Sequence, residues 1–222
     1  NVRFYEGEEN NDDDFSKSLA DIADIYVNDA FSVCHREHAS VHGITKYLPS
    51  YAGFALNLEI EMLEKSLQDS EPPMMGIIGG SKVSSKLSLL SNLVEKMQFL
   101  AIGGGMANTF LAAQGKNIGA SFYEKNMIKE AKEILEKAKI SNCDIILPID
   151  AVVANKLEFG VESKTIELKD MVKENMILDV GEKTVELISN AIINSKTLLW
   201  NGPLAVFEIP PFDQSTSSCA LT

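Results

Sequence analysis

Short apolar runs that alternate with helical patterns are the feature of this sequence that most limits its possible folds. They predict strands at 75–78, 99–102, 144–148 and 197–200. Helices are predicted at 84–97, 106–114, 124–139 and 185–194. Strands separated by helices form a parallel sheet with right-handed crossovers. The sequence therefore predicts an α/β fold, in which ligands bind beyond the carboxyl ends of the strands.

Glycine-rich loops follow three of the four predicted strands. Gly79-Gly80 ends the first strand, Gly103–Gly105 the second, and Asn201–Pro203, which contains Gly202, the fourth; Pro148–Asp150 ends the third. Glycine lets a backbone approach a ligand closely, and these loops meet at one edge of a parallel sheet. We therefore expect a backbone-lined pocket for phosphate or a nucleotide at that edge.

The stretch MMGIIGGSKVSSK, residues 74–86, predicts a strand, a tight turn and a helix start. Lys82 and Lys86 would oppose the dipole of that helix unless a polyanion lay between them. The alternative is a plain strand-to-helix turn with two solvated lysines, because the stretch matches neither common glycine-rich nucleotide motif. The neighbouring glycine loops favour a phosphate site.

A polar loop, SVCHREHASVHG at 32–43, contains all three histidines of the chain, His35, His38 and His42, together with Arg36. Zinc is one interpretation, but the spacing fits no ordinary zinc finger. An anion site is better supported, since arginine can hold a phosphate or carboxylate with two hydrogen bonds. A solvated surface loop is the remaining alternative.

The N-terminal third has a less regular pattern. It predicts a short strand at 1–4, a helix at 15–25, a strand at 25–31 and one long amphipathic helix at 51–68. The polar segment Asp69–Pro73, with its two prolines, predicts a domain boundary. Because the chain begins and ends inside predicted elements, we expect it to be a piece of a longer protein.

Composition argues against several classes of protein. A net charge of −12 argues against general binding to nucleic acid or to a membrane surface. No apolar run approaches the roughly 20 residues that span a bilayer. The three widely spaced cysteines predict reduced thiols and a cytoplasmic location.

Seven motifs in a fixed order resemble the phosphoglycerate kinase family, over essentially all 222 residues. They are NVRF, YVNDAFSVCHREHAS, LPSYAGF, GIIGGSKVSSK, AIGGGMANTFL, ILPIDAVVA and WNGPLAVFE. The resemblance implies two Rossmann-like three-layer α/β domains with parallel sheets, the N-terminal one incomplete and the C-terminal one truncated. Residues 1–73 would be the C-terminal part of a substrate-binding N-domain with an interdomain helix. Residues 74–222 would be a nucleotide-binding C-domain.

The resemblance also implies roles for individual residues. Catalysis would depend on Lys82 and Arg36. The triose substrate would be bound by Arg3, Arg36, His35 and His38. The nucleotide would be bound by Lys82, Lys86, Gly103, Gly104, Gly105, Ile177, Leu178, Asn201 and Glu208. Ser81, Ile177 and Ala205 depart from the family, which usually has alanine at the first position and glycine at the other two.

The implied activity is the reversible glycolytic transfer of a phosphoryl group between 1,3-bisphosphoglycerate and ADP, giving 3-phosphoglycerate and ATP. A cytoplasmic monomer that uses ATP or ADP with Mg²⁺ is implied, closing about a hinge near 51–68 and 207–211. The family's magnesium-binding aspartate does not occur in this sequence. We therefore expect no metal ligand here and poor activity from these 222 residues alone.

Two alternatives belong to other classes. A dinucleotide oxidoreductase is one, although the first turn has no G-x-G-x-x-G and no acidic residue ends the second strand. A non-catalytic nucleotide-binding or scaffold protein with a residual kinase fold is the other. The presence of Lys82, Lys86, Glu208, Arg3 and Arg36 argues against such decay.

Overall fold

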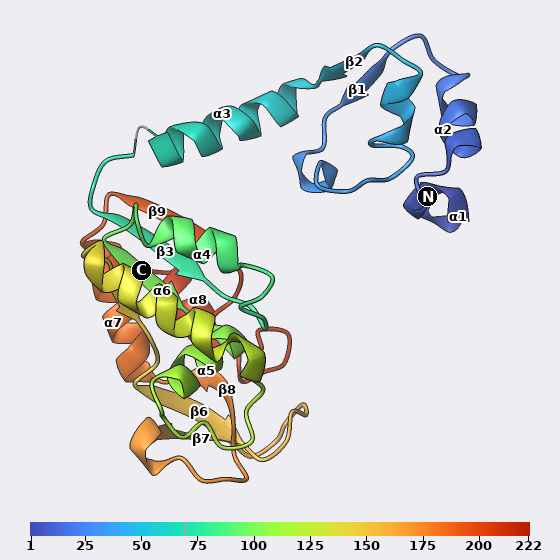
Figure 1. The fold of residues 1–222 in the computed structure, drawn as a ribbon. Coiled ribbons are helices and arrows are strands. Elements are labelled where there is room, and N and C mark those ends of the chain that lie inside the picture. Colours follow the sequence, from blue (N-terminus) through green and yellow to red (C-terminus); the bar gives the residue numbers. More distant parts are fainter. Residues whose placement is uncertain (69) are drawn as a thin grey trace. The chain divides into compact units, whose positions relative to one another are not determined.

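The chain forms two compact units, Asn1–Asp69 and Ser70–Thr222 (Figure 1). The computed structural model describes residues 1–68 and 70–222, and the side chains of all of these except 66–68. Each unit is described by itself below.

Two short parallel strands and several short helices make up the first unit. The strands are β1 (Tyr26–Asn28) and β2 (Ser50–Ala52), with Tyr26 opposite Ser50. The helices are η1 (Val2–Phe4), α1 (Glu6–Glu9), α2 (Asp13–Ala20), η2 (Phe31–Val33), η3 (Gly43–Lys46) and α3 (Phe54–Gln68). The strand predicted at 25–31 exists as β1 but is shorter than predicted, since it ends at Asn28 and η2 begins at Phe31. The strand predicted at 1–4 is wrong, because the Asn1 side chain accepts the N–H of Arg3 and starts a 3₁₀ turn.

Long-range contacts set where α3 begins. The helix was predicted from residue 51, but Ser50–Ala52 pairs with β1 instead. The Asp29 carboxylate accepts the N–H of Leu56 at 2.9 Å and so caps the helix from a distant loop. A Cβ at Gly53 would overlap this carboxylate, so glycine is needed where the two segments meet.

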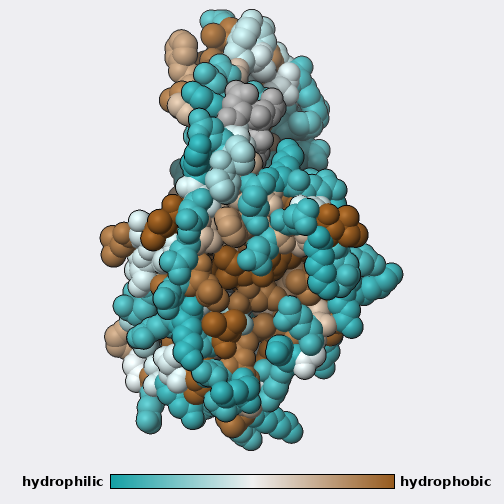
Figure 2. Space-filling view, turned by 90° about the vertical axis from the view of Figure 1, so that its left-hand side faces the viewer, coloured by the Kyte–Doolittle hydropathy of each residue, from teal (hydrophilic) through white to brown (hydrophobic). Residues whose placement is uncertain are grey.

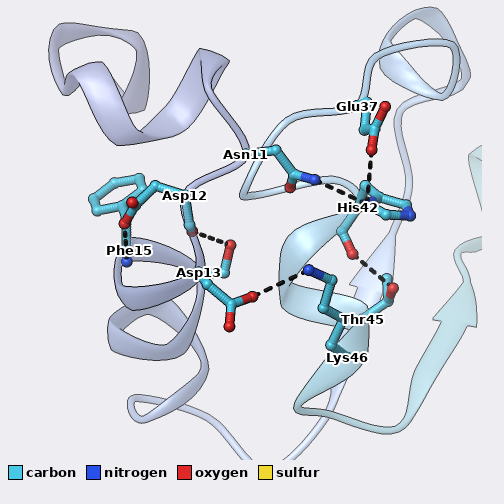
Figure 3. Close-up of polar contacts among 9 residues, drawn as sticks. Asn11, Asp12, Asp13, Phe15, Glu37, His42, Thr45 and Lys46 are labelled. Atoms are coloured by element: carbon cyan, nitrogen blue, oxygen red, sulfur yellow. Dashed lines mark hydrogen bonds and ion pairs between the residues drawn. The ribbon is translucent and has the colours of Figure 1, made fainter.

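Polar side chains join α2 to η3 (Figure 3). Asp12 caps α2 by accepting the N–H of Phe15 at 2.8 Å, which starts the helix at Asp13 rather than at the predicted residue 15. Lys46 Nζ lies 3.0 Å from Asp13 Oδ1. These contacts tie the end of the histidine-containing loop to α2.

A four-stranded parallel sheet forms the centre of the second unit. Its order is β5 (Asp144–Ile146), β4 (Phe99–Ile102), β3 (Met74–Ile78) and β9 (Thr197–Asn201). These are the four strands predicted from the sequence, and their parallel pairing is confirmed. The third is shorter than predicted, since it ends at Ile146.

Helices cover both faces of this sheet (Figure 1). Successive strand residues point to opposite faces, so Met74 and Ile78 join one buried cluster and Met75 and Ile77 join the other. The first cluster contains α4 (Leu87–Leu93), α5 (Gly104–Ala113) and α6 (Ile128–Ile140), whereas the second contains α7 (Glu182–Ile193) and α8 (Gln214–Ala220). The unit is therefore a three-layer α/β structure.

The sequence did not predict a second, antiparallel sheet. It consists of β7 (Lys164–Glu167), β6 (Asp150–Ala154) and β8 (Met176–Val180). The buried Asp150 carboxylate links this sheet to α7, accepting the N–H groups of Lys183 at 3.0 Å and Thr184 at 2.9 Å. A Cβ at Gly181 would overlap the same carboxylate.

Helix starts in the second unit differ from those predicted, and α7 begins at Glu182 rather than residue 185. α4 begins at Leu87 rather than residue 84, and α5 begins at Gly104 rather than residue 106. α6 begins at Ile128 and follows the short η4 (Lys125–Met127). Residues 82–86 therefore precede a helix and do not form its first turn.

Apolar side chains also reach the surface of the larger unit. Figure 2 shows hydrophobic residues gathered in a hollow that hydrophilic residues border. Leu187, Ile193 and Leu198 are among the large exposed hydrophobic residues of the unit. Among the residues that the structure describes, none of the helices combines the length and apolar character needed to span a membrane.

Candidate functional site

A cavity of about 500 Å³ lies at the carboxyl edge of the central sheet. Residues from the loop after β3, the start of α5, strand β8 and the loop after β9 line it. They include Gly80, Ser81, Gly104, Gly105, Met176, Ile177, Leu178, Pro203, Leu204, Ala205, Val206 and Glu208. This is the edge at which the sequence predicted a pocket.

The glycines at this edge bring the loops together. A Cβ at Gly79 would overlap the carbonyl oxygen of Pro203, and a Cβ at Gly103 would lie 2.6 Å from Leu204 Cα. Gly104 has a φ of +66° and donates its N–H to the carbonyl of Leu204 at 2.7 Å. Close approach between the loops therefore requires glycine here.

Lys86 holds its ammonium group over the ends of β3 and β9. Its Nζ donates to the carbonyl oxygens of Gly79 at 2.8 Å and Asn201 at 3.3 Å, and to Asn201 Oδ1. Burial lowers the pKa of Lys86. All three recorded acceptors are uncharged, so the lysine charge is not neutralised by them.

A carboxylate from another segment holds the loop that carries both lysines. Glu124 accepts the N–H of Ser84 at 3.0 Å and its hydroxyl at 2.6 Å. Partial burial raises the pKa of Glu124, but the hydrogen bonds from Ser84 and Val83 and the charge of Lys82 outweigh it, so the pKa is lowered. These contacts help to explain why residues 82–86 stay outside α4.

The predicted nucleotide-binding residues divide into two groups. Gly104, Gly105, Ile177, Leu178 and Glu208 line the cavity. The others lie outside its lining. Gly103 packs under Leu204, and Lys82 is exposed in the loop after β3. In the same loop, Lys86 contacts Asn201. The structure therefore brings Lys86 and Asn201 together beside Gly80, a residue of the cavity wall.

Several lining residues were missed by sequence reasoning. They include Asn108, Phe122, Leu157, Met176, Asp179 and Val206. Met176 and Asp179 belong to β8, which the sequence did not predict. Asn108 offered a signal, because it is a polar residue in the otherwise largely apolar run after the glycine triplet.

Asp179 is a buried carboxyl group in the cavity wall, only 1% exposed. Burial raises its pKa, hydrogen bonds from Ser215 and from the N–H of Val180 oppose that effect, and the charge of Asp213 adds to it; the result is a pKa of about 6. The contact with Ser215 joins β8 to α8.

In the first unit, the predicted substrate-binding residues have different surroundings. His38 Nδ1 lies 3.6 Å from the buried carboxylate of Glu8, which also accepts the N–H and hydroxyl of Ser40. Arg3 and His35 are exposed. Arg36 is half-buried, and its Nε has no hydrogen-bond partner among the described residues. Arg36 thus keeps donor capacity for an anion, whereas His38 has a partner within the unit.

In the described residues, no set of side chains around the histidine-containing loop is arranged to bind zinc. Asn11 contacts His42 Nδ1 at 3.1 Å, and Glu37 lies 3.9 Å from the same atom (Figure 3). Within the described part of the chain, no group of three or more histidine, cysteine, aspartate or glutamate residues is arranged to hold a metal ion.

The second unit is an α/β structure with a parallel central sheet and a cavity at the carboxyl edge of that sheet. A lysine ammonium group lies beside that cavity. The profile of one family, described as phosphoglycerate kinase, matches residues 1–222, and the chain belongs to this family.

Individual relatives agree with the family match. Phosphoglycerate kinase of Caulobacter vibrioides is 52% identical over 220 residues, which are 99% of this chain and 56% of that protein. The Rhizobium johnstonii enzyme of the same name is 50% identical, over 99% of this chain and 55% of that protein.

Solved structures give the same result. Phosphoglycerate kinase from Coxiella burnetii has a TM-score of 0.83 and 39% identity, and the match covers 100% of this chain and 57% of that chain. The enzyme from Pyrococcus horikoshii OT3 has a TM-score of 0.83 and 27% identity, over 99% of this chain and 57% of that chain.

These comparisons confirm the resemblance and the two-domain, Rossmann-like fold class. They leave the oxidoreductase alternative without support. The chain spans about half the length of the curated relatives it matches.

Proposed function

We propose that the protein to which this chain belongs transfers a phosphoryl group reversibly between 1,3-bisphosphoglycerate and ADP, giving 3-phosphoglycerate and ATP. Residues 74–222 would bind the nucleotide, and residues 1–73 would contribute part of the triose-binding domain and the interdomain helix. The observation that carries the proposal is the ammonium group of Lys86 at the glycine loops beside the cavity.

The size and lining of the cavity support a nucleotide site. Its volume of about 500 Å³ falls within the range typical of small-molecule pockets. Ile177 and Leu178 offer an apolar wall for a base, and Glu208 offers a carboxylate for ribose hydroxyls. The phosphates would then extend past Gly80 towards Lys86.

Positively charged side chains are what this chain offers for phosphoryl transfer. Transfer from an acyl phosphate to ADP needs little acid–base help, because the leaving carboxylate and the attacking phosphate oxygen are both stable anions. Positioning and charge neutralisation therefore lower the barrier. Lys86 has uncharged acceptors that phosphate oxygens can replace, Lys82 is exposed in the same loop, and Arg36 has an unpartnered Nε among the described residues.

The residues present do not fit a protein-held magnesium site. Asp179 accepts hydrogen bonds from Val180 and Ser215, and no cluster of three metal-binding side chains occurs in residues 1–68 and 70–222. Mg²⁺ commonly binds through substrate phosphates with one or two carboxylates. Family membership further supports a cytoplasmic, monomeric enzyme.

Nucleotide binding tests the proposal more directly than turnover, because we expect the 222 residues alone to turn over poorly. Calorimetric titration of the chain with ADP should give saturable binding. Lys86→Met should weaken it by about tenfold or more, since a charge-assisted phosphate contact is lost. Lys129→Met is the matched control, because Lys129 is an exposed lysine on α6 with a side chain 85% accessible.

The single tryptophan, Trp200, lies in β9, so its fluorescence checks that each variant remains folded. Equal ADP affinity in the Lys86 variant and the control would contradict the proposed phosphate site. Absence of ADP binding to the unaltered chain would refute the nucleotide role of this unit.

A further inference from the structure

Both arginines of the chain lie in the first unit, on two segments that a buried carboxylate joins. The sequence contains only Arg3 and Arg36, so these side chains carry the only guanidinium groups of the chain. Arg3 is exposed in η1, the turn that directly precedes α1. Arg36 is half-buried in the histidine-containing loop, shortly before Ser40. Whatever joins α1 to this loop therefore decides how the two arginines lie relative to each other.

Glu8, on α1, is the residue that joins the two segments. It is 2% exposed, and its carboxylate accepts the N–H of Ser40 at 2.9 Å and the Ser40 hydroxyl at 2.6 Å. Its backbone carbonyl accepts the N–H of Ala39 at 2.9 Å, and His38 Nδ1 lies 3.6 Å from its Oε1. Three consecutive residues of the loop thus contact one residue of α1.

A buried carboxylate is a costly means of holding two segments together, because hydrogen bonds must replace the water that it loses. Apolar side chains of similar size could join the segments by packing alone. The carboxylate adds a defined geometry, since each of its oxygens has its own donor on Ser40. A shift of the loop along α1 would break a hydrogen bond to a buried carboxylate. Glu8 therefore fixes the segment of Arg36 relative to the segment of Arg3.

We propose that Glu8 is a positioning residue, which holds Arg3 and Arg36 so that both bind the same anionic triose ligand. This inference rests on the proposed function, in which the two arginines bind 3-phosphoglycerate. A guanidinium group can hold a phosphate or carboxylate with two hydrogen bonds, and binding costs less entropy when the segment that carries it is already fixed. Glu8 acts through the loop and not on the ligand, because its carboxylate is buried against Ser40.

Heteronuclear NMR tests the inference, because the Nε–H signals of the 222-residue chain come from only two arginines. During titration with 3-phosphoglycerate, both signals should shift with one common dissociation constant. Glu8→Ala should weaken binding by about tenfold or more and give the two signals different dissociation constants, since the arginines are no longer held together. Glu8→Gln has the same size and keeps an acceptor for Ser40, so its affinity should stay within about threefold. Glu9→Ala, which removes the same charge from an exposed position of α1, is the control and should keep the common constant.

The outcomes separate this inference from the function on which it rests. Backbone N–H signals of β1 and β2 show whether the first unit of each variant remains folded. An unchanged common dissociation constant in folded Glu8→Ala overturns the positioning role alone, as does a loss in Glu8→Gln as large as that in Glu8→Ala. Ser40→Ala keeps the N–H contact and should weaken binding by about threefold, so unchanged affinity in this milder variant overturns the inference even where Glu8→Ala does not fold. If neither arginine signal of the unaltered chain responds to 3-phosphoglycerate, the triose-binding role of this unit is refuted and the inference falls with it.

Discussion

Replacing Asp179 by asparagine removes a buried titratable group from the wall of the cavity. The carboxyl is 1% exposed, and burial outweighs its hydrogen bonds to bring its pKa to about 6, against an ordinary value of 3.8. The folded chain therefore keeps this proton to higher pH than the unfolded chain does. Between about pH 4 and pH 6 the folded state binds more protons, so its stability falls as the pH rises.

The size of this effect follows from the two pKa values. A difference of about two units corresponds to about 3 kcal/mol, at about 1.4 kcal/mol per unit. Because the unfolded carboxyl is already more than half ionised at pH 4, about 2 kcal/mol of this loss in the free energy of unfolding should fall between pH 4 and pH 7. Asparagine cannot ionise, so the variant should lack that part of the pH dependence.

Urea unfolding followed by Trp200 fluorescence measures the effect, because this tryptophan lies in the same unit as Asp179. The free energy of unfolding of the unaltered chain minus that of Asp179→Asn should decrease by about 2 kcal/mol from pH 4 to pH 7. Taking the difference removes the titration of shared groups. Asp144→Asn, at the exposed start of β5, is the control and should show no such trend. A difference that stays constant across this pH range would refute the assigned burial and its sign.

Two further predictions concern positions where distant segments meet. Gly181→Ala should lower the free energy of unfolding of the second unit by about 2–4 kcal/mol in urea, because the new Cβ would overlap the Asp150 carboxylate. The control is Gly160→Ala, where no neighbouring atom lies within 4 Å of the new Cβ but φ is +73°. It should lower the free energy of unfolding by only about 1 kcal/mol. Equal losses of unfolding free energy in the Gly181 and Gly160 variants would show that the overlap with Asp150 is relieved without cost. Glu124→Ala should weaken ADP binding about threefold to tenfold in calorimetry, because Ser84 and the lysine loop lose their anchor. ADP affinity equal to that of Glu136→Ala, a change at an exposed residue of α6, would exclude this positioning role.

The pattern of neighbouring residues was sufficient to predict the central sheet and the edge of the sheet at which the cavity lies. All four strands are short, apolar and separated by helices, so residues within a few positions of one another decide them. The glycine loops were visible for the same reason. The ordered motifs also identified the family, because their residue types and spacing are recorded in the chain itself.

Contacts between distant segments decided the rest. The start of α3 depends on Asp29 and that of α7 on Asp150, two carboxylates far away in sequence that no local window includes. Strand β8 brings Ile177 and Asp179 to the cavity by pairing with β6, and the amide of Asn108 acquires its orientation only from the carbonyl of Phe122. Neighbouring residues along the chain determine strand and helix preferences, whereas burial and hydrogen-bond partners exist only once the chain has folded.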